Sequence, residues 1–295
     1  MAINGTNGTT SQKVWLITGC SSGLGATIAE AALARGDTVV ATARDPSKLS
    51  DLVNRGALAE VLDVTSPDDE LAATAERIAS RTGGHIDILV NSAGYLLSGG
   101  IEEVSRAEAL ATFETNVFGQ LNVLRAVLPI MRRTGSGGVV ANLGSIGGWH
   151  GTPGAGLYCA TKACASLLSE ALRAEVAHLG IQVTAIEPGY TRTNFLVAGH
   201  QMRAKRVIDD LRPGVDPTVE ALGAYSMKQP GDPVKLAQLV VEALTGSGRC
   251  AGKKLPPRLL IGKDAYQIVA GNIQEHQENW KEWEELATAT NCDDA

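Results

Sequence analysis

The chain has 295 residues, of which 44% are hydrophobic and 20% charged, so it can bury one large core and is too mixed in composition for a fibrous protein. The formal net charge of −6 comes from the end of the chain, since residues 272–295 carry seven acidic residues and one lysine. The body is therefore close to neutral, which argues against a nucleic-acid partner held by phosphate contacts. No apolar run approaches the roughly 20 residues of a membrane span, which argues against a membrane protein.

The ends and the cysteines bear on compartment and organisation. Residues 1–12 are polar and lack the charged and hydrophobic layout of an export signal. The five cysteines are odd in number, and neither they nor the five histidines show metal-ligand spacing. We therefore expect a cytoplasmic protein without a metal site, folded as a single domain over residues 1–295 that begins with a short polar tail.

The first recognisable unit is a strand, a glycine turn and a helix. Residues 14–18 form an apolar run that leads into Thr18-Gly-Cys-Ser-Ser-Gly-Leu-Gly25, and an Ala-rich helical pattern follows to Arg35. Glycines in such a turn let backbone N–H groups at a helix start approach a pyrophosphate. Tight packing of a strand on a helix also uses glycine, so the turn favours nucleotide binding without proving it.

The second strand, residues 38–43, ends at Arg44-Asp-Pro. In dinucleotide-binding α/β folds, the residue that contacts the adenosine ribose lies at the end of the second strand. An arginine pairs with a 2'-phosphate through its planar fork, which favours NADP over NAD. The alternative is that Arg44 is a solvated strand end and that Asp45 caps the helix beginning at Pro46.

Strands and helices continue to alternate. A third strand over 58–65 carries Asp63, which either contacts adenine or satisfies a turn. A helix over 66–82 and a fourth strand over 86–90 follow. That strand ends in Asn91-Ser-Ala-Gly94, where small residues leave room for a flat ring or a ribose against the backbone.

The helical pattern over 105–133 contains Asn116 among apolar neighbours. Asparagine is a poor mid-helix residue because its side chain competes for backbone hydrogen bonds. A buried Asn116 therefore needs partners: it is either satisfied within the core or holds a water in a proton path. A fifth strand, 139–143, then delivers Ser145 at its carboxyl end.

A helix that begins near Ala155 places Tyr158 and Lys162 four residues apart on one face. A phenol has an ordinary pKa near ~10, so it is a poor base at neutral pH unless a cation stabilises its anion. Lys162 is placed to be that cation, and Ser145 is placed to bond the same substrate oxygen. A Tyr-x-x-x-Lys pair is common on helices, so its meaning depends on the rest of the chain.

The remaining pattern supplies a sixth strand (181–186), a helix (233–244) and a seventh strand (257–262). The alternation predicts an α/β fold of the doubly wound Rossmann type, with a seven-stranded, mostly parallel sheet and helices on both faces. Ligands are expected above the carboxyl ends of the strands, where all the candidate residues map.

In order and interval, these motifs resemble the short-chain dehydrogenases/reductases in their single-domain form. The resemblance spans residues 13–192 and rests on Thr18-Gly-Cys-Ser-Ser-Gly-Leu-Gly25, Asn91-Ser-Ala-Gly94, Asn116, Ser145, Tyr158-Cys-Ala-Thr-Lys162 and Pro188-Gly189. Ser92 departs mildly from the family pattern, which often begins Asn-Asn, and Arg44 resembles the residue that marks NADP-preferring members.

The resemblance implies a role for each polar candidate. Tyr158 would be the acid/base, and Lys162 would hold the nicotinamide ribose and lower the pKa of Tyr158. Ser145 would orient the carbonyl, and Asn116 would anchor a water that joins Lys162 to solvent. The residues expected to line the cofactor are Gly19, Ser21, Ser22, Gly23, Leu24, Gly25, Arg44, Asp63, Val64, Asn91, Ala93, Gly94, Tyr158, Lys162, Pro188, Gly189 and Thr191.

We therefore expect an NADP(H)-dependent oxidoreductase that transfers hydride between nicotinamide and a carbonyl or secondary alcohol. In this family the segment equivalent to residues 194–232 covers the substrate, and here it forms either an apolar lid or a solvated loop with helical pieces. Its apolar residues and a few earlier ones suggest a fairly hydrophobic ketone; they are Phe195, Leu196, Val197, Met202, Leu211, Tyr225, Leu96, Leu97, Trp149 and Tyr190. Two other functions remain open: isomerisation or dehydration on the same fold, and nucleotide binding by a regulator without turnover.

Residues 264–295 are expected to form an acidic helical tail. Ile273, Trp280, Trp283 and Ala287 fall roughly on one helical face. We expect this face to pack either on the body of its own chain or on a neighbouring subunit. The resemblance implies a homodimer or a homotetramer.

Overall fold

The computed structural model describes residues 12–197 and 201–292. The predicted polar tail therefore lies outside the described residues except for Gln12. The same holds for residues 198–200 of the predicted substrate-covering segment and for residues 293–295 of the acidic tail.

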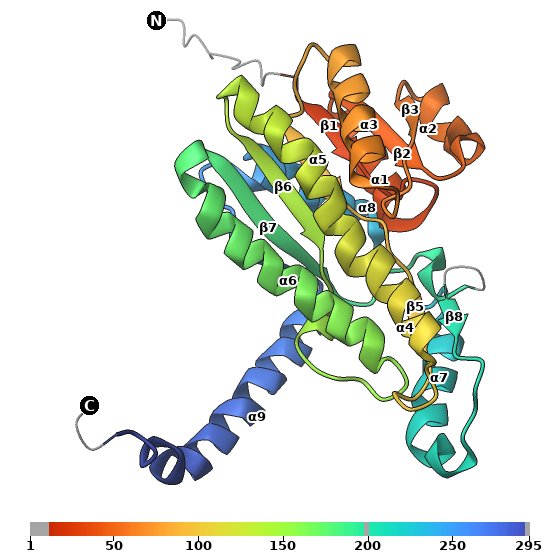
Figure 1. Cartoon of the computed structure of the whole chain (residues 1–295), viewed down its shortest axis with the longest axis vertical. Coiled ribbons are helices and arrows are strands. Elements are labelled where there is room, and N and C mark those ends of the chain that lie inside the picture. The colour runs from red at the N-terminus through yellow and green to blue at the C-terminus, as the bar shows by residue number, and fades with distance from the viewer. Residues whose placement is uncertain (1–11, 198–200, 293–295) are drawn as a thin grey trace, which may run out of the picture.

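A seven-stranded sheet forms the centre of the molecule (Figure 1). Its strand order is β3-β2-β1-β4-β6-β7-β9, and all neighbouring strands pair in parallel. The strands are β1 (Val14–Ile17), β2 (Thr38–Ala43), β3 (Leu58–Val61), β4 (Ile88–Asn91), β6 (Gly138–Leu143), β7 (Ile181–Pro188) and β9 (Arg258–Ile261). The predicted doubly wound fold is confirmed, and this sheet is parallel throughout.

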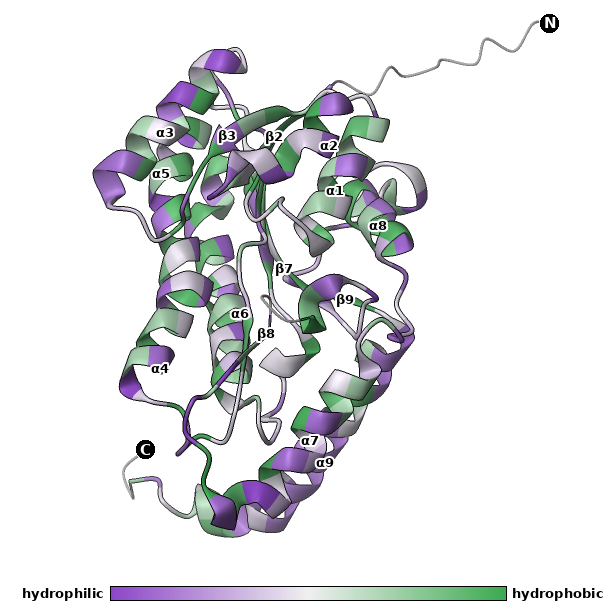
Figure 2. Cartoon of the chain, turned by 90° about the vertical axis from the view of Figure 1, so that its right-hand side faces the viewer, coloured by the Kyte–Doolittle hydropathy of each residue, from purple (hydrophilic) through white to green (hydrophobic). Residues whose placement is uncertain are grey.

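Helices cover both faces of the sheet (Figure 2). One layer, which includes α1 and α8, packs through residues such as Ile28 and Val240, and the other, which includes α3 and α5, packs through Ile78 and Val127. The helices are α1 (Gly23–Ala34), α2 (Ser50–Asn54), α3 (Asp68–Arg81), α4 (Arg106–Phe113), α5 (Gly119–Thr134), α6 (Gly156–Val176), α7 (Arg212–Tyr225), α8 (Pro233–Thr245) and α9 (Lys263–Thr288). Both faces of the inner strands β1, β2, β4, β6 and β7 are thereby buried, which explains their nearly continuous apolar sequences.

The strand order reverses between β1 and β4, and this reversal creates the crevice in which such sheets bind ligands. The glycine turn leaves β1 there, and residues 91–94 leave β4 beside it. Thr18 ties the two segments together, since its Oγ1 accepts hydrogen bonds from the backbone N–H groups of Ser92 (3.0 Å) and Ala93 (3.2 Å). The two loops are thus held in one fixed arrangement.

The predicted helix over 105–133 is interrupted by a turn of π-helix. Ser105 and Glu108 form a capping box at the start of α4, and the π turn covers Glu114–Phe118 before α5 begins. Asn116 lies within this turn. The wider turn accommodates the residue whose side chain was expected to disturb a regular helix, and such turns often occur at functional sites.

The segment over 194–232 contains a short strand that the sequence did not predict, and a helix, which agrees with the helical pieces of one interpretation. β8 (Gln201–Arg203) pairs in parallel with β5 (Leu96–Ser98), and α7 follows before the chain returns to the sheet at α8. Figure 1 places β5, β8 and α7 together, next to the lower end of α4. These elements form a small layer beyond the carboxyl edge of the central sheet.

Helix α9 begins on the body and then projects away from it (Figure 1). Ala265 and Val269 near its start are buried, whereas the side chains of Ile273, Trp280 and Trp283 are 42%, 66% and 62% exposed. The expectation that this apolar face packs on its own chain is therefore wrong, because the helix leaves the body after its first turns. Packing on a neighbouring subunit stays a prediction. Within the described ranges, no helix is long and apolar enough to cross a membrane.

Candidate active site

A cavity of about 790 Å³ runs from the glycine turn after β1 to the start of α6. Most of the predicted site residues line it: Gly19, Ser21, Ser22, Gly23, Leu24, Arg44, Asp63, Val64, Ala93, Gly94, Ser145, Tyr158, Lys162, Pro188, Gly189 and Thr191. Gly25, Asn91 and Asn116 do not line it. The fold therefore brings together residues from segments far apart in the sequence.

Two glycines of the turn, Gly19 and Gly25, are packed so closely that a side chain is excluded at each position. Gly19 has φ +71°, and a Cβ there would lie 2.9 Å from the backbone nitrogen of Ala93. A Cβ on Gly25 would lie 2.5 Å from the carbonyl oxygen of Gly19. Gly25 thus lies behind the cavity wall and lets the start of α1 approach the glycine turn. Backbone N–H groups at this helix start can then face a ligand in the cavity.

Two cations mark the cavity near the end of β2. Arg44 follows that strand and is exposed, and Lys48 in the one-turn helix Pro46–Leu49 also lines the cavity. Asp45 caps that turn by accepting from the Ser47 N–H at 3.0 Å, and the hydrogen bonds from Ser47 lower the pKa of its carboxyl. The capping interpretation of Asp45 is therefore confirmed. Lys48 was missed, although its place four residues after Arg44, in the turn that Asp45 caps, was a usable signal.

Asp63 satisfies a turn, as one of its two interpretations proposed. Its Oδ1 accepts from the backbone N–H of Thr65 at 3.0 Å and from the Thr65 hydroxyl at 2.8 Å. This turn explains why the third strand ends at Val61, before the predicted end at residue 65. Asp63 also lines the cavity, so the turn holds its side chain at the wall.

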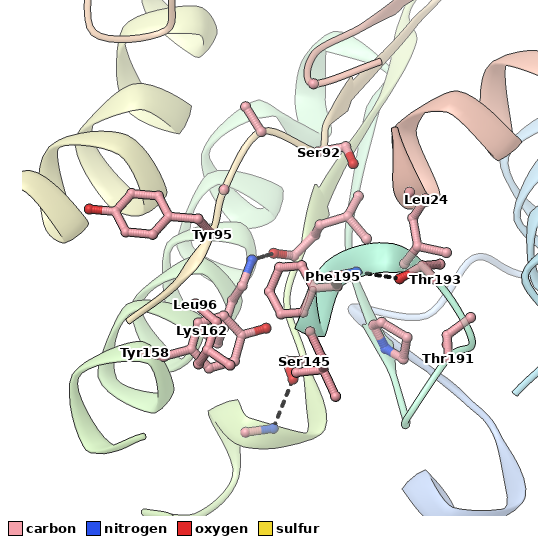
Figure 3. Close-up of a pocket in the computed structure, with 18 of the residues that line it drawn as sticks. Leu24, Ser92, Tyr95, Leu96, Ser145, Tyr158, Lys162, Thr191, Thr193 and Phe195 are labelled. Atoms are coloured by element: carbon pink, nitrogen blue, oxygen red, sulfur yellow. Dashed lines mark hydrogen bonds between the residues drawn. The ribbon is translucent and has the colours of Figure 1, made fainter. Parts of the chain in front are cut away.

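Ser145, Tyr158 and Lys162 lie together in the wall, as Figure 3 shows. The Ser145 side chain lies close enough to the Tyr158 phenol to lower its pKa, and the Lys162 Nζ lies 5.7 Å from the centroid of the Tyr158 ring. The Ser145 Oγ also accepts from the Gly147 N–H at 3.0 Å, a bond that fixes the serine rotamer. The spacing of Tyr158 and Lys162 along α6 produces the predicted shared site.

The electrostatics of this group differ from the prediction. Burial raises the pKa of the Tyr158 phenol above its ordinary value of 10.0, and the interaction with Ser145 offsets only part of this shift. The protein alone therefore does not lower the pKa of Tyr158 as predicted, because desolvation disfavours the phenolate more than the neighbouring groups stabilise it. Burial also lowers the pKa of Lys162 from 10.5 to about 8. Its ammonium donates to the Leu143 carbonyl oxygen at 2.6 Å and remains mostly charged at neutral pH.

Asn116 is fully buried and satisfied within the protein. Its Nδ2 donates to the Tyr95 carbonyl at 2.9 Å and to the Thr161 Oγ1 at 3.2 Å, and its Oδ1 accepts from the Tyr95 N–H at 3.0 Å. Both amide hydrogens are used, so the side chain keeps only one acceptor lone pair. The core interpretation accounts for these contacts, and a bound water stays a prediction.

Asn91 also lies behind the cavity wall. Its side chain is buried, and its Nδ2 donates to the Oδ1 of Asn142 at 2.9 Å, while the Nδ2 of Asn142 donates to the Ser169 hydroxyl at 2.9 Å. This chain of bonds links the ends of β4 and β6 to α6. Asn91 therefore supports the strand end from which Ala93 and Gly94 reach the cavity.

A buried polar network anchors the loop that carries Ser145. The Trp149 Nε1 donates to one oxygen of Glu187 at 2.7 Å, and the Ser166 hydroxyl donates to the other at 2.5 Å. The Arg258 guanidinium lies 4.7 Å from the Trp149 ring centroid. Burial raises the pKa of Glu187, and the bonds from Ser166 and Trp149 partly offset this effect. Trp149 was expected at the substrate and instead fastens the loop to β7.

Apolar side chains line the cavity beside Tyr158. They come from the start of α6, the β5 segment and the layer after residue 194, and they are Leu96, Ala155, Phe195, Leu196, Met202 and Leu222. The centroids of the Tyr158 and Phe195 rings are 5.8 Å apart, and Figure 3 shows Phe195 and Leu96 near Tyr158. Of the expected apolar residues, Leu97, Val197, Leu211 and Tyr225 do not line the cavity.

Comparisons with known proteins agree with this geometry. The family model described as short chain dehydrogenase matches residues 13–204. A short-chain dehydrogenase from Streptomyces avermitilis has a solved structure that is 40% identical, covers 95% of this chain and 99% of its own, and superposes with a TM-score of 0.85. The oxidoreductase BOA17 of Botryotinia fuckeliana is 36% identical, covering 94% of this chain and 99% of its own length. A 3-ketoacyl-(acyl-carrier-protein) reductase from Brucella melitensis, solved with NADH, is 25% identical, covers 86% of this chain and 98% of its own, and has a TM-score of 0.69.

The chain therefore belongs to the short-chain dehydrogenase family, and it is an oxidoreductase. The family match reaches residue 204, so it includes the glycine turn, Ser145, Tyr158 and Lys162. The resemblance inferred from the motifs is confirmed.

Proposed function

We propose that this protein is an NADP(H)-dependent reductase of ketones, reversible in principle. One observation carries the proposal: Tyr158, with Ser145 and Lys162 beside it, lines the same cavity as the glycine turn. A proton donor and a dinucleotide site in one cavity are the two requirements of carbonyl reduction by hydride transfer.

The residues at the far end of the cavity fit a phosphorylated dinucleotide. Gly19 and Gly25 let the first turn pack against the segment after β4 and against the start of α1, where a Cβ would meet backbone atoms. The turn held in this way would bind the pyrophosphate at the start of α1. Arg44 and Lys48 would hold a 2'-phosphate, which supports NADP, whereas a lone acidic residue in that place would favour NAD. When bound, the cofactor supplies the hydride.

The chain's own residues would handle the proton. Ser145 and Tyr158 would hold the carbonyl oxygen of the substrate, and the Tyr158 hydroxyl would donate its proton to that oxygen as the alkoxide forms. Because burial raises the pKa of Tyr158, a nearby positive charge is needed to reduce the cost of the phenolate, and the Lys162 ammonium is close enough to supply it. Asn116 would hold the Tyr95 loop and a water on the path from Lys162 to solvent.

The apolar wall beside Tyr158 supports a fairly hydrophobic ketone as substrate, because burial of its apolar surface would supply binding energy. The layer from residue 194 onward would close over such a substrate. We also propose a homo-oligomer, and the exposed Trp280 and Trp283 of α9 support this assembly.

The experiment is a panel of apolar ketones assayed with NADPH that carries deuterium at the transferable position. A reductase places the label in the alcohol product and consumes one NADPH for each product molecule. An isomerase or dehydratase would form product without net oxidation of NADPH, and a regulator would bind NADPH without turnover across the panel. Either of these results would contradict the proposal.

A further inference from the structure

The turn that follows Ser145 packs directly on the backbone of α6. This single turn of 3-10 helix covers Ile146–Gly148, and a Cβ on Gly148 would lie 3.1 Å from the carbonyl oxygen of Lys162. The Ser145 carbonyl oxygen accepts from the Gly148 N–H at 2.9 Å, so the serine is part of the same rigid turn. The contact between the turn and α6 therefore determines where Ser145 lies relative to Tyr158, which Figure 3 shows close to it.

The far end of this turn is fastened by a closed cluster of three side chains, Trp149, Glu187 and Arg258, which we call the clamp. The Trp149 Nε1 donates to one carboxylate oxygen of Glu187 at 2.7 Å, and the Arg258 Nη1 lies 3.6 Å from the other. The Arg258 guanidinium also lies 4.7 Å from the centroid of the Trp149 ring, so each member contacts both others. Because Glu187 ends β7 and Arg258 begins β9, the clamp joins the turn to two strands of the sheet.

The clamp also reaches α6, one helical turn beyond Lys162. The Ser166 hydroxyl lies 2.5 Å from Glu187 Oε1 and 3.2 Å from the Lys162 carbonyl oxygen. It has one hydrogen to donate, and the charged carboxylate is the stronger acceptor. The Arg258 Nε donates to Glu170, which is also in α6, at 2.5 Å. The turn and the helix that carry the reacting side chains are thus bonded to the same buried carboxylate.

A buried charge is a poor means of stabilising a fold. Glu187 is 0% exposed, and buried ion pairs can often be replaced by apolar side chains of similar volume without loss of stability. Hydrogen bonds from an indole and a hydroxyl to a carboxylate nevertheless fix distance and direction, which apolar contacts do not. Catalytic groups must be held within about 0.5 Å of their productive geometry by such supporting contacts. The clamp therefore fits a positioning role better than a stabilising one.

We propose that Glu187 is a positioning residue for proton transfer. It acts on Ser145 through Trp149, and it acts on α6 through Ser166. The inference rests on the proposed function and goes beyond it, since it assigns an effect on the reaction to residues that do not line the cavity. Loss of the clamp should therefore slow the chemical step and leave the binding of ketone and NADPH unaffected.

A second buried pair of the same chemistry supplies a matched control. Asp37, just before β2, is 5% exposed, and its Oδ2 accepts from the Trp15 Nε1 at 2.8 Å. It also pairs with Arg35. These residues lie near the amino ends of β1 and β2, at the edge of the sheet opposite the cavity, and none of them lines it. Trp15→Phe and Trp149→Phe thus remove the same kind of bond, and only the second is next to the Ser145 turn.

The activity test uses a ketone that the native protein reduces and compares Trp149→Phe with Trp15→Phe. We expect Trp149→Phe to lower the single-turnover rate of hydride transfer by about tenfold to a hundredfold, since a displacement of about 1 Å can have that effect. The KM for the ketone and the dissociation constant for NADPH should change by less than about twofold, because only the chemical step is affected. Trp15→Phe should keep the native rate even where it lowers stability.

Two variants of Glu187 separate its hydrogen bonds from its volume. Glu187→Met removes both acceptor oxygens and should slow hydride transfer as Trp149→Phe does. Glu187→Gln keeps an acceptor for the indole N–H and places an amide beside Ser166, so it should recover most of the native rate. If Glu187→Met does not fold, the comparison of Trp149→Phe with Trp15→Phe decides by itself.

Hydrogen exchange gives a readout that needs no turnover. The backbone N–H groups of residues 147–149 are bonded within the turn that follows Ser145. Without nucleotide, these amides should exchange faster in Trp149→Phe than in the native protein, measured relative to the amides of β4 in the same molecule. Trp15→Phe should leave this relative exchange unchanged.

Three results would overturn the inference: equal single-turnover rates in Trp149→Phe and Trp15→Phe, a rate in Glu187→Gln no higher than in Glu187→Met, or unchanged relative exchange of residues 147–149 in Trp149→Phe. The proposed function fails separately, if the native protein reduces no ketone. In that case the exchange comparison would still decide whether the clamp holds the turn.

Discussion

Lys162 should reduce the stability of the fold that holds it. Its side chain is 6% exposed, and burial lowers its pKa from 10.5 to about 8. Since each tenfold change in an equilibrium corresponds to about 1.4 kcal/mol, burial disfavours the charged ammonium by roughly 3 kcal/mol. Methionine fills similar volume without a charge, but it leaves the Leu143 carbonyl without its donor, at a cost of about 1–3 kcal/mol. We predict that Lys162→Met raises the free energy of unfolding by up to about 2 kcal/mol at pH 7 while it abolishes turnover.

The effect has a defined pH dependence. The pKa of Lys162 in the folded protein lies below its value in the unfolded chain, so below about pH 8 the native state carries the buried charge at its full cost. As the pH rises from about 8 towards 10.5, the folded lysine becomes neutral while the unfolded one is still charged, and the cost disappears. The stability advantage of Lys162→Met should therefore be largest at neutral pH and should shrink above about pH 8.

The assay is urea denaturation without nucleotide, at neutral pH and at about pH 9.5, inside the interval over which the cost disappears. Lys281→Met on α9 is the control, since Lys281 is exposed and its loss should change little at either pH. A Lys162→Met variant less stable than the native protein at neutral pH, or a stability difference that does not depend on pH, would refute the reasoning. The predicted result would show that the lysine is retained for function at the expense of stability.

Three further predictions test other parts of the site. Arg44→Asp should lower the ratio of kcat/KM for NADPH to that for NADH by about tenfold or more, because repulsion replaces a charge-assisted contact; an unchanged ratio would remove Arg44 from the cofactor site. Trp149→Phe should lower the free energy of unfolding by about 1–3 kcal/mol in denaturant titrations, because buried Glu187 loses a donor; unaltered stability would contradict this role. Gly25→Ala should weaken NADPH binding in a fluorescence titration, because the new Cβ would lie 2.5 Å from the Gly19 carbonyl oxygen. Gly271→Ala, which has open space around it, is the control and should bind NADPH normally. Equal NADPH affinity in the two variants would show that the close packing of α1 on the glycine turn does not determine cofactor binding.

The parts of the fold that sequence predicts well have local signals. The strand expected over 38–43 is β2 with the same bounds, because an apolar run between turns is sufficient to define a buried parallel strand. The Tyr158–Lys162 pair follows in the same way from helix geometry, since residues four apart share a face. The glycine turn was recognisable because the spacing of its glycines resembles that of nucleotide-binding turns and because the turn directly follows the first strand.

The parts that were missed depend on contacts between distant residues. β5 and β8 have three residues each and pair across about a hundred positions, so neither carries a periodic signal of its own. In α7, Pro213 stands in the first turn, where its missing N–H costs little, but in sequence it indicates a loop. The raised pKa of Tyr158 likewise depends on burial, which only the packed structure provides.

The central claim is that Tyr158 supplies the proton that accompanies hydride transfer. It is tested most directly by Tyr158→Phe, which removes the hydroxyl and leaves the ring and its contact with Phe195. Hydride transfer is followed by the loss of reduced-nicotinamide absorbance in a single turnover, and NADPH affinity is measured in parallel. The account predicts a rate lower by two or more orders of magnitude, as expected for loss of a general acid, with NADPH affinity nearly unchanged. A rate close to that of the native protein would contradict it.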